Sequence, residues 1–402
     1  MCSLGDDYEN NEEKYLPQKN IGLDNCRCNK CRHEKASILL RGKDAYCRNC
    51  FLASTNHKFK AILGKSKLIR PYDKVLISFD VGHPSVALLH LIRSGLDLDT
   101  PKRLKFIPVV VFIEDRYHLS LDERKEMLRD IQTEVNNFQL KLYFVSLANC
   151  LSSENEINIS ENILNVTELD KAKLSTVVAN NANETTKNEL LFILKRNVLL
   201  KVAKNLDCKF IFTPELSIDI ASNLLSNVSL GRGDNISLDT GFCDNRDERV
   251  KILRPLRDFD MKEVAFYNVL HHLNPISVRG REVNSNHSVQ NLMRDFITKL
   301  QSDYPATVTT IVKTGDKLTT QIKDNCDRRC RLCNGTITQR PTELSSEEST
   351  NFSKLISNSF RDPTIPVEDR CKSVVEGFTN SPKHEQVYCF SCSKISDYLL
   401  DF

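Results

Sequence analysis

Short apolar runs alternate with amphipathic stretches through the middle of the chain. Apolar runs lie at 74–79 (KVLISF), 106–113 (FIPVVVFI), 141–147, 208–213 and 250–253. Runs of this length, rich in Val, Ile and Phe, are typical of strands buried in a parallel sheet. The segments between them carry the spacing of helices. The pattern therefore predicts repeated strand–helix–strand units and a doubly wound, mostly parallel α/β sheet.

The helices of this α/β region are indicated by apolar residues recurring on one helical face. One begins with a capping box, because Ser120 is followed three residues later by Glu123. The others are predicted at 85–93, 189–205, 217–228 and 261–270. Ligands of such sheets bind at the carboxyl ends of the strands. We therefore expect residues 80–85, 114–115, 213–215 and 254–257 to surround one crevice.

Composition divides the 402-residue chain into further segments. Residues 1–25 hold six acidic and two basic side chains and are predicted to be a flexible acidic tail, whereas 26–70 is a basic, cysteine-containing segment. The α/β domain is predicted at 71–284, with a polar, weakly patterned and mobile insertion at 149–187. Residues 285–402 are predicted to form a separate module, with a helix at 287–300 and a strand at 307–312.

Two sets of paired cysteines lie in the segments that flank the predicted sheet. Cys28, Cys31, Cys47 and Cys50 form C-x2-C, fifteen residues, C-x2-C, which is the spacing of a four-thiolate zinc ribbon. Cys330, Cys333, Cys389 and Cys392 form two further pairs 55 residues apart. Either these four share a second structural zinc, with Cys326 and Cys371 as substitute ligands, or they are two separate reduced pairs.

The first cysteine group lies in a strongly basic stretch. Between residues 26 and 74 there are thirteen Lys or Arg and three acidic residues, although the formal net charge of the whole chain is only +3. A metal can fix the fold of such a ribbon while its cations contact the backbone of a nucleic acid. The candidate contacts are Arg27, Lys30, Arg32, Arg41, Lys43, Arg48, Lys58 and Lys60.

Residues 1–14 are polar and acidic and lack the apolar core of a signal peptide, and the longest apolar runs, 75–79 and 106–113, are too short to span a membrane. Fifteen cysteines in such a chain are expected to be reduced and to bind metal, so we expect a cytoplasmic protein with no membrane partner.

The turn after the first apolar run has the frame of a phosphate-binding loop. A strand, a short turn and a helix place backbone N–H groups at a helix N-terminus. This frame resembles that of the ATP-pyrophosphatase-like tRNA thiolases of the adenine-nucleotide α-hydrolase-like fold, whose loop reads Ser-Gly-Gly-x-Asp-Ser. This chain reads Asp80-Val81-Gly82-His83-Pro84-Ser85, so only Gly82 and Ser85 match. Asp80 would repel phosphate, Val81 disfavours positive φ, and Pro84 donates no hydrogen bond.

The resemblance extends over most of residues 26–395 and narrows to the second, partner subunit of the cytoplasmic tRNA 2-thiolation complex. It rests on YCRNCF and KFKAILGK, the degenerate loop, LSNVSLGRG and ILRPLRDFDMKEVAFY, and the C-terminal CRLCNG and YCFSCSK. It implies a role in 2-thiolation of wobble uridine in tRNA Lys, Glu and Gln. It also implies tRNA as a partner, together with a catalytic sister subunit that takes sulfur from a thiocarboxylated ubiquitin-like modifier.

The degenerate loop favours a subunit with no catalytic residues and no bound ATP. Two alternatives stay open. The chain could itself be an ATP-dependent sulfurtransferase with an atypical loop, or a zinc-ribbon adaptor that holds the sister subunit without touching RNA. The α/β region also lacks a C-x-x-C; we expect Cys208 to be an inert buried thiol, and only Cys243 is a candidate reactive one.

Other polar groups near the crevice have both structural and ligand-binding interpretations. Glu114 and Asp115 could bind a ribose hydroxyl or a magnesium ion, but beside a degenerate loop they are expected to be solvated carboxylates. Gly231 suits a helix C-terminus, and Arg232 beside it is a candidate RNA contact. Arg254 and Arg257 are expected to contact phosphate or to pair with Asp258 or Asp260. His271 and His272 are expected at a helix end.

Overall fold

The computed structural model describes residues 26–41, 43–101, 103–151, 157–164, 172–176, 183–276, 288–318, 328–337, 349–350, 352–354, 357 and 387–396. The tail predicted at 1–25 lies outside these residues, as do Cys326, Cys371 and much of the insertion predicted at 149–187.

The described core is a six-stranded sheet in the order β5-β4-β3-β6-β8-β7. All neighbours pair in parallel except the edge pair β7 and β8. The predicted α/β fold with a mostly parallel sheet is confirmed. The strands are β3 (Lys74–Phe79), β4 (Ile107–Glu114), β5 (Lys141–Ser146), β6 (Phe210–Phe212), β7 (Cys243–Asp244) and β8 (Lys251–Leu253).

The strand order places a topological switch point at the centre of the sheet. The first strand, β3, lies between β4 and β6, so the chain builds outward to β5 and then returns to the other side of β3. Val75, Leu76 and Ile77 of β3 are completely buried, because helices cover both faces. A switch point leaves a crevice at the carboxyl ends of the strands, here after Phe79 and Phe212.

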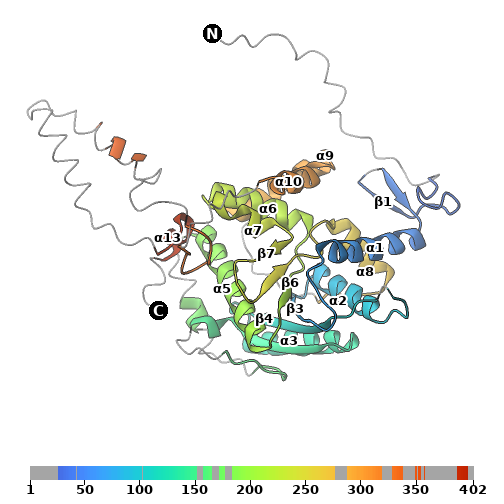
Figure 1. Cartoon of the computed structure of the whole chain (residues 1–402), viewed down its shortest axis with the longest axis horizontal. Coiled ribbons are helices and arrows are strands. Elements are labelled where there is room, and N and C mark those ends of the chain that lie inside the picture. The colour runs from blue at the N-terminus through green and yellow to red at the C-terminus, as the bar shows by residue number, and fades with distance from the viewer. Residues whose placement is uncertain are drawn as a thin grey trace, which may run out of the picture. The chain divides into compact units, whose positions relative to one another are not determined.

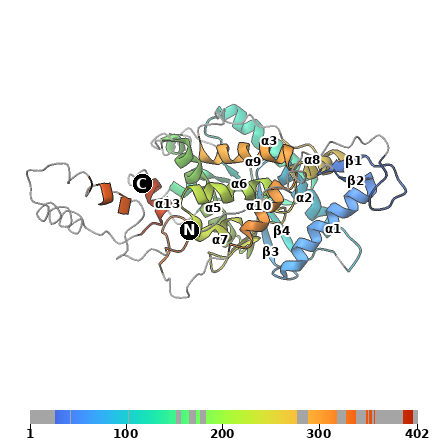
Figure 2. The ribbon, with the colours of Figure 1, turned by 90° about the horizontal axis from the view of Figure 1, so that it is seen from above.

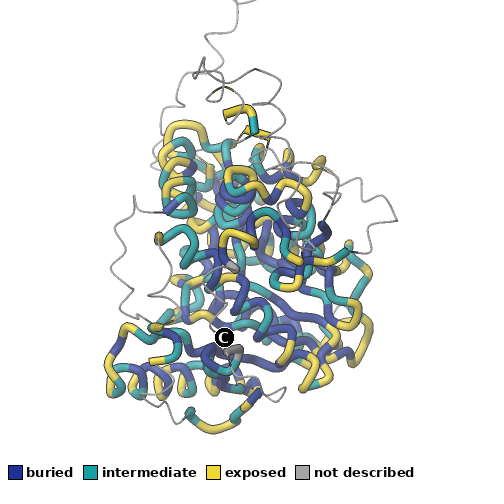
Figure 3. Tube along the Cα trace, turned by 90° about the vertical axis from the view of Figure 1, so that its left-hand side faces the viewer, coloured by how far each residue is buried: buried dark blue, intermediate teal, exposed yellow. Residues whose placement is uncertain are grey.

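Helices pack on both faces of the sheet (Figure 1). Helix α2 packs against α8, and α6 packs against α9 and α10. Buried residues concentrate along the strands and the inner faces of these helices (Figure 3).

The described helices of the whole chain are α1 (Arg48–Ser66), α2 (His83–Leu96), α3 (Leu121–Asn137), α5 (Glu184–Asn205), α6 (Ser217–Ser229), α7 (Ile236–Thr240), α8 (Met261–Leu270), α9 (Val289–Asp303), α10 (Thr307–Gly315) and α13 (Phe390–Ser396), with 3₁₀ turns η3 (Leu147–Leu151) and η4 (Gly233–Asn235).

The basic N-terminal segment contains a hairpin and one long helix. Strands β1 (Ile38–Leu40) and β2 (Asp44–Tyr46) pair in antiparallel register, and α1 begins directly after Cys47. Phe51, Thr55, Phe59 and Leu63 of α1 are buried at intervals of four residues, which marks the face that packs on the α/β core. Figure 2 shows α1 running as a continuous rod away from the hairpin.

The prediction of a strand at 307–312 is wrong, because this segment lies in helix α10. Its Val and Thr residues favour strands locally, but Val308 and Val312 are one helical turn apart. Both are buried in a cluster with Ile220 of α6 and Ile297 of α9. Tertiary packing therefore overrides the local preference.

The chain divides into two compact units. The first comprises residues up to Thr320 together with 397–402, and the second comprises Gln321–Ser396. This division falls beyond the boundary expected near residue 285, because α9 and α10 pack on α6 of the first unit. No helix in the described part of the chain has the length and apolar content needed to span a bilayer.

Candidate functional site

The first cysteine group is brought together as the sequence predicts. The Sγ atoms of Cys28, Cys31, Cys47 and Cys50 all lie within 4.8 Å of one another, and those of Cys31 and Cys47 are 3.9 Å apart. The pKa of the Cys28 thiol is lowered to about 6: burial raises it, but backbone N–H groups of Cys31, Cys47 and Lys30 outweigh burial. Four converging thiols at this spacing fit a single divalent ion.

The second group joins cysteine pairs that are distant in the sequence. Cys330, Cys333, Cys389 and Cys392 are all buried, and their Sγ atoms also lie within 4.8 Å of one another. The two pairs meet because the backbone N–H of Arg331 donates to the carbonyl of Val387 at 3.0 Å. The four thiols could therefore hold one ion, and the alternative of two separate pairs does not fit this geometry.

The two groups are built alike. In each, the first pair lies in a turn closed by a single antiparallel bridge, Arg27 to Lys35 and Arg329 to Thr336. In each, the residue after the second cysteine has positive φ, 60° at Arg32 and 55° at Asn334. The remaining pair lies at the start of a helix, α1 or α13. The thiols of this pair thus lie near the positive end of a helix dipole.

The cations predicted to contact tRNA occupy three kinds of position. Arg48 Nη2 donates to the carbonyl of Leu270 at 2.9 Å, which ties the start of α1 to the end of α8. Lys58 Nζ lies 2.7 Å from Glu263 and 4.3 Å from the centre of the Phe259 ring, so it also holds α1 on α8. Lys60 is half-buried. The others are exposed on the ribbon: Arg27, Lys30, Arg32, Arg41 and Lys43.

The degenerate loop is closed by its own carboxylate. Asp80 Oδ1 accepts hydrogen bonds from the Ser85 hydroxyl and from the backbone N–H of Gly82, the latter at 3.2 Å. The N–H of Asp80 donates to Ser85 Oγ at 3.1 Å. Val81 nevertheless adopts φ 65°, with its side chain buried in the core. A carboxylate therefore occupies the N-terminal end of α2, where a phosphate would otherwise lie.

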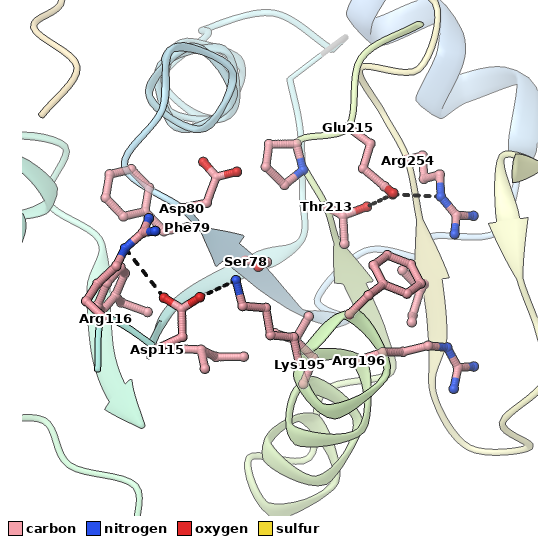
Figure 4. A pocket seen from close by; sticks show the side chains of 16 residues that line it. Ser78, Phe79, Asp80, Asp115, Arg116, Lys195, Arg196, Thr213, Glu215 and Arg254 are labelled. Atoms are coloured by element: carbon pink, nitrogen blue, oxygen red, sulfur yellow. Dashed lines mark hydrogen bonds and ion pairs between the residues drawn. The ribbon is translucent and has the colours of Figure 1, made fainter. Parts of the chain in front are cut away.

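A cavity of about 210 Å³ lies beside this loop, at the switch point of the sheet (Figure 4). Asp80 points toward it, and Phe79, Phe112 and Phe192 contribute apolar walls. Further lining residues come from the ends of β3, β4, β6 and β8 and from α5: Ser78, Ile113, Asp115, Arg116, Lys195, Arg196, Leu199, Thr213, Pro214, Glu215, Ile252 and Arg254. The predicted crevice is thus present.

The two carboxylates at the end of β4 are not solvated as expected. Glu114 is completely buried against Arg124, whose Nε donates to it at 2.9 Å. Asp115 pairs with Lys195 at 2.5 Å and with Arg116 at 3.5 Å. Burial raises the pKa of Asp115, but Lys195 and then Arg116 outweigh it and hold the pKa below its usual value.

The arginines of the crevice region are structural. Arg254 Nε donates to Glu215 at 2.7 Å and its Nη1 donates to the carbonyl of Gly241, whereas Arg257 pairs with Asp316. Their carboxylate partners in the described structure are therefore Glu215 and Asp316 and not Asp258 or Asp260. Arg232 is buried and lies 2.9 Å from Glu189, which removes it as an RNA contact.

The structure agrees with the predictions made for Gly231 and His271 at helix ends and for Cys208 as a buried thiol. Gly231 has φ 74° directly after the cap of α6, and His271 caps α8. Cys208 is buried, and burial raises its pKa to about 11. Burial also raises the pKa of Cys243, which disfavours its role as a reactive thiol.

Three features of the site were not predicted from the sequence. Lys195 and Phe192 reach the crevice from α5, about 80 residues after Asp115, and no local signal pairs them. The bond from Ser85 to Asp80 was also missed, although a serine at the start of a helix and an aspartate five residues earlier are a readable signal.

Comparison with known proteins assigns the chain to one family. The family model described as cytoplasmic tRNA 2-thiolation protein 2 matches residues 288–394. The proteins of that name from Xenopus tropicalis and Danio rerio are each 31% identical to this chain, over 88% and 80% of it and over 82% and 72% of their own lengths. The Aedes aegypti protein is 29% identical over 89% of this chain and 87% of its own length.

A solved structure shares the fold. The U34-tRNA thiolase NcsA from Methanococcus maripaludis, determined with its [4Fe-4S] cluster, matches with a TM-score of 0.57 and 16% identity, over 82% of this chain and 95% of that one. That likeness concerns architecture alone. The sequence comparison, which covers 88% of this chain at 31% identity, shows that the chain belongs to the cytoplasmic tRNA 2-thiolation protein 2 family.

Proposed function

We propose that this chain is the non-catalytic partner subunit of a tRNA thiolation complex, required for 2-thiolation of wobble uridine in tRNA Lys, Glu and Gln. Membership of the 2-thiolation protein 2 family supports the pathway. The observation that supports the non-catalytic role is the Asp80 carboxylate bound within the degenerate loop.

An ATP phosphate would have to displace this carboxylate. Asp80 already accepts from Gly82 and Ser85, and its negative charge repels a second anion at the same helix terminus. The four cations that line the cavity offer little compensation, because each already has a carboxylate partner. Arg116 and Lys195 pair with Asp115, Arg196 pairs with Asp244, and Arg254 pairs with Glu215. Activation of the uridine therefore belongs to a catalytic sister subunit, and sulfur comes from a thiocarboxylated ubiquitin-like carrier that serves that subunit.

The ribbon supplies the tRNA contact, and both cysteine groups hold structural zinc. Zn–S bonds of about 2.3 Å require sulfur atoms about 3.8 Å apart, close to the separations of 3.9 Å and 3.8 Å at Cys31–Cys47 and Cys333–Cys389. Separations this short favour one tetrahedral ion over a cluster of several irons. When bound, zinc fixes the fold of the ribbon, and its exposed arginines and lysines meet RNA phosphates. The family name points to the cytoplasm as the site of action.

Two titrations on the isolated chain test this function. With ATP, calorimetry should record no binding; saturable binding would favour the alternative of an atypical sulfurtransferase. With tRNA, affinity should fall steeply as salt rises, because binding releases counterions from phosphates. Absence of tRNA binding at low salt would favour an adaptor that never touches RNA.

A further inference from the structure

Tyr72 is held in an unfavourable conformation with its ring in solvent. Its φ is 67°, in the left-handed region that aromatic residues rarely adopt, and its side chain is 76% exposed. Its backbone N–H donates to the carbonyl of Lys105 at 2.6 Å. Backbone in this region that the surrounding structure enforces is often associated with function.

The turn that presents Tyr72 is fixed from its inner side. The buried Asp73 accepts from the backbone N–H of Arg70 at 2.8 Å and from Lys209 Nζ at 2.8 Å. The N–H of Asp73 also donates to the carbonyl of Arg70. The only carboxylate of this turn is therefore directed inward, and the outer surface carries the tyrosine ring.

Helix α1 connects this turn to the ribbon. Its 19 residues contain no acidic side chain and extend for about 28 Å, from the cap at Cys47 to the cap at Lys67. Between the buried positions its exposed residues are small or basic, including Ala53, His57 and Lys65. In the view of Figure 2, α1 forms an edge of the molecule from the hairpin onward.

Exposed lysines lie at the end of α1, a few residues before Tyr72, and at Lys105, whose carbonyl accepts from the Tyr72 N–H. Lys65, Lys67 and Lys105 make no ion pair with any residue the structure describes, in contrast to Lys58 in the middle of α1. Lysines bind phosphate as point charges, and aromatic rings bind unpaired bases by stacking. An acidic protein segment would use the charges but not the strained, outward ring.

We propose that the RNA-binding surface continues from the ribbon along α1 to Tyr72, where the ring stacks on an unpaired base of the bound RNA. Lys67 and Lys105 hold the phosphates that flank this base. The inference rests on the proposed tRNA-binding function and adds a second contact point, about one helix length from the cysteine group.

The chain contains no tryptophan, so a Tyr72→Trp variant carries one fluorophore at the proposed contact. Titration with tRNA should quench its fluorescence, and a fully paired RNA duplex of equal length should bind without quenching. Tyr72→Phe should bind tRNA like the wild type, since stacking needs only the ring.

Tyr72→Gly removes the ring from a backbone that glycine adopts freely, so its unfolding temperature should not fall. Its affinity for tRNA should drop at least about 5-fold, given the strength of base–aromatic stacking. Tyr304→Ala, at another exposed tyrosine, is the matched control and should leave affinity unchanged. Lys67→Ala with Lys105→Ala should lower the slope of log affinity against log salt by about 1 to 2.

Wild-type affinity in Tyr72→Gly, with no quenching in Tyr72→Trp, would overturn this inference and leave the ribbon contact standing. No tRNA binding by the wild-type chain at low salt would overturn the proposed function and this inference together.

Discussion

The loop after β3 shows how single residues can keep a backbone shape while changing its chemistry. Val81 holds φ 65° despite its branched side chain, and Gly82 still offers its N–H. The anion that satisfies this N–H is the Asp80 carboxylate of the same chain. The sequence correctly indicates a poor phosphate site, but the internal hydrogen bonds that close it depend on side-chain direction.

Asp80 and Ser85 should be energetically coupled. Asp80→Ala should lower the free energy of unfolding by about 1 kcal/mol, because two donors lose a charged acceptor at a partly solvated position. In a double-mutant cycle with Ser85→Ala, measured by urea unfolding, the coupling should be about 0.5–1 kcal/mol. Asp80→Asn keeps Oδ1 as an acceptor, so as a control it should lower the free energy of unfolding less than Asp80→Ala does. Strict additivity of Asp80→Ala and Ser85→Ala would contradict the bond.

A half-buried histidine should make stability depend on pH. His90 of α2 bonds Tyr267 at 2.8 Å and contacts Phe138 and His271, and burial together with the charge of His271 lowers its pKa to about 4. An unfolded histidine titrates near 6.5. Between pH about 6.5 and 4 the unfolded chain binds more protons, so stability should fall as pH falls through this window.

His90→Gln removes this titration while keeping polar atoms for Tyr267. Between pH 7 and pH 4.5, the free energy of unfolding should fall by about 1 kcal/mol more in the wild type than in His90→Gln. This figure allows for the partial exposure of His90. Urea midpoints at the two pH values measure the difference. Equal losses in both proteins would exclude His90 as the source.

At the scale of elements, α1 carries one lysine that forms an ion pair within the fold and one that does not. Lys58 pairs with the largely buried Glu263 across the α1–α8 contact, whereas Lys60, two residues on, makes no ion pair with a described residue. Lys58→Met should lower the free energy of unfolding by about 1–3 kcal/mol, because Glu263 loses its partner. Urea unfolding measures this loss.

Lys60→Met is the matched control on the same helix. It should change stability by no more than about 0.5 kcal/mol while weakening tRNA binding and its salt dependence. The opposite result, a stable Lys58→Met and an unstable Lys60→Met, would contradict the assignment of these two lysines.

The two cysteine groups should each hold one metal ion. Elemental analysis should find two zinc ions per chain, with one lost in Cys28→Ser and the other in Cys389→Ser. Cys208→Ala, at a buried cysteine outside both groups, should lose neither. Cys28→Ser should also abolish the salt-dependent tRNA binding of the ribbon. Full zinc content in Cys28→Ser would show that the first group is not a site.

At the scale of the whole molecule, the sequence predicts the sheet well because each central strand is a short, continuous apolar run. It predicts the first cysteine group because the spacing is local. It fails at α10, where the buried pair Val308 and Val312 is recognisable only against α6, and at Lys195, whose partner Asp115 is distant in the sequence. Features set by long-range packing carry no local pattern.

The most direct test of the account is 2-thiolation of wobble uridine with purified components. ATP, tRNA and a thiocarboxylated sulfur carrier would be combined with this chain alone, the catalytic sister subunit alone, or both. The account predicts product only when both chains are present, with Asp80 unchanged. Product formed by this chain alone would contradict it and make the chain itself the sulfurtransferase.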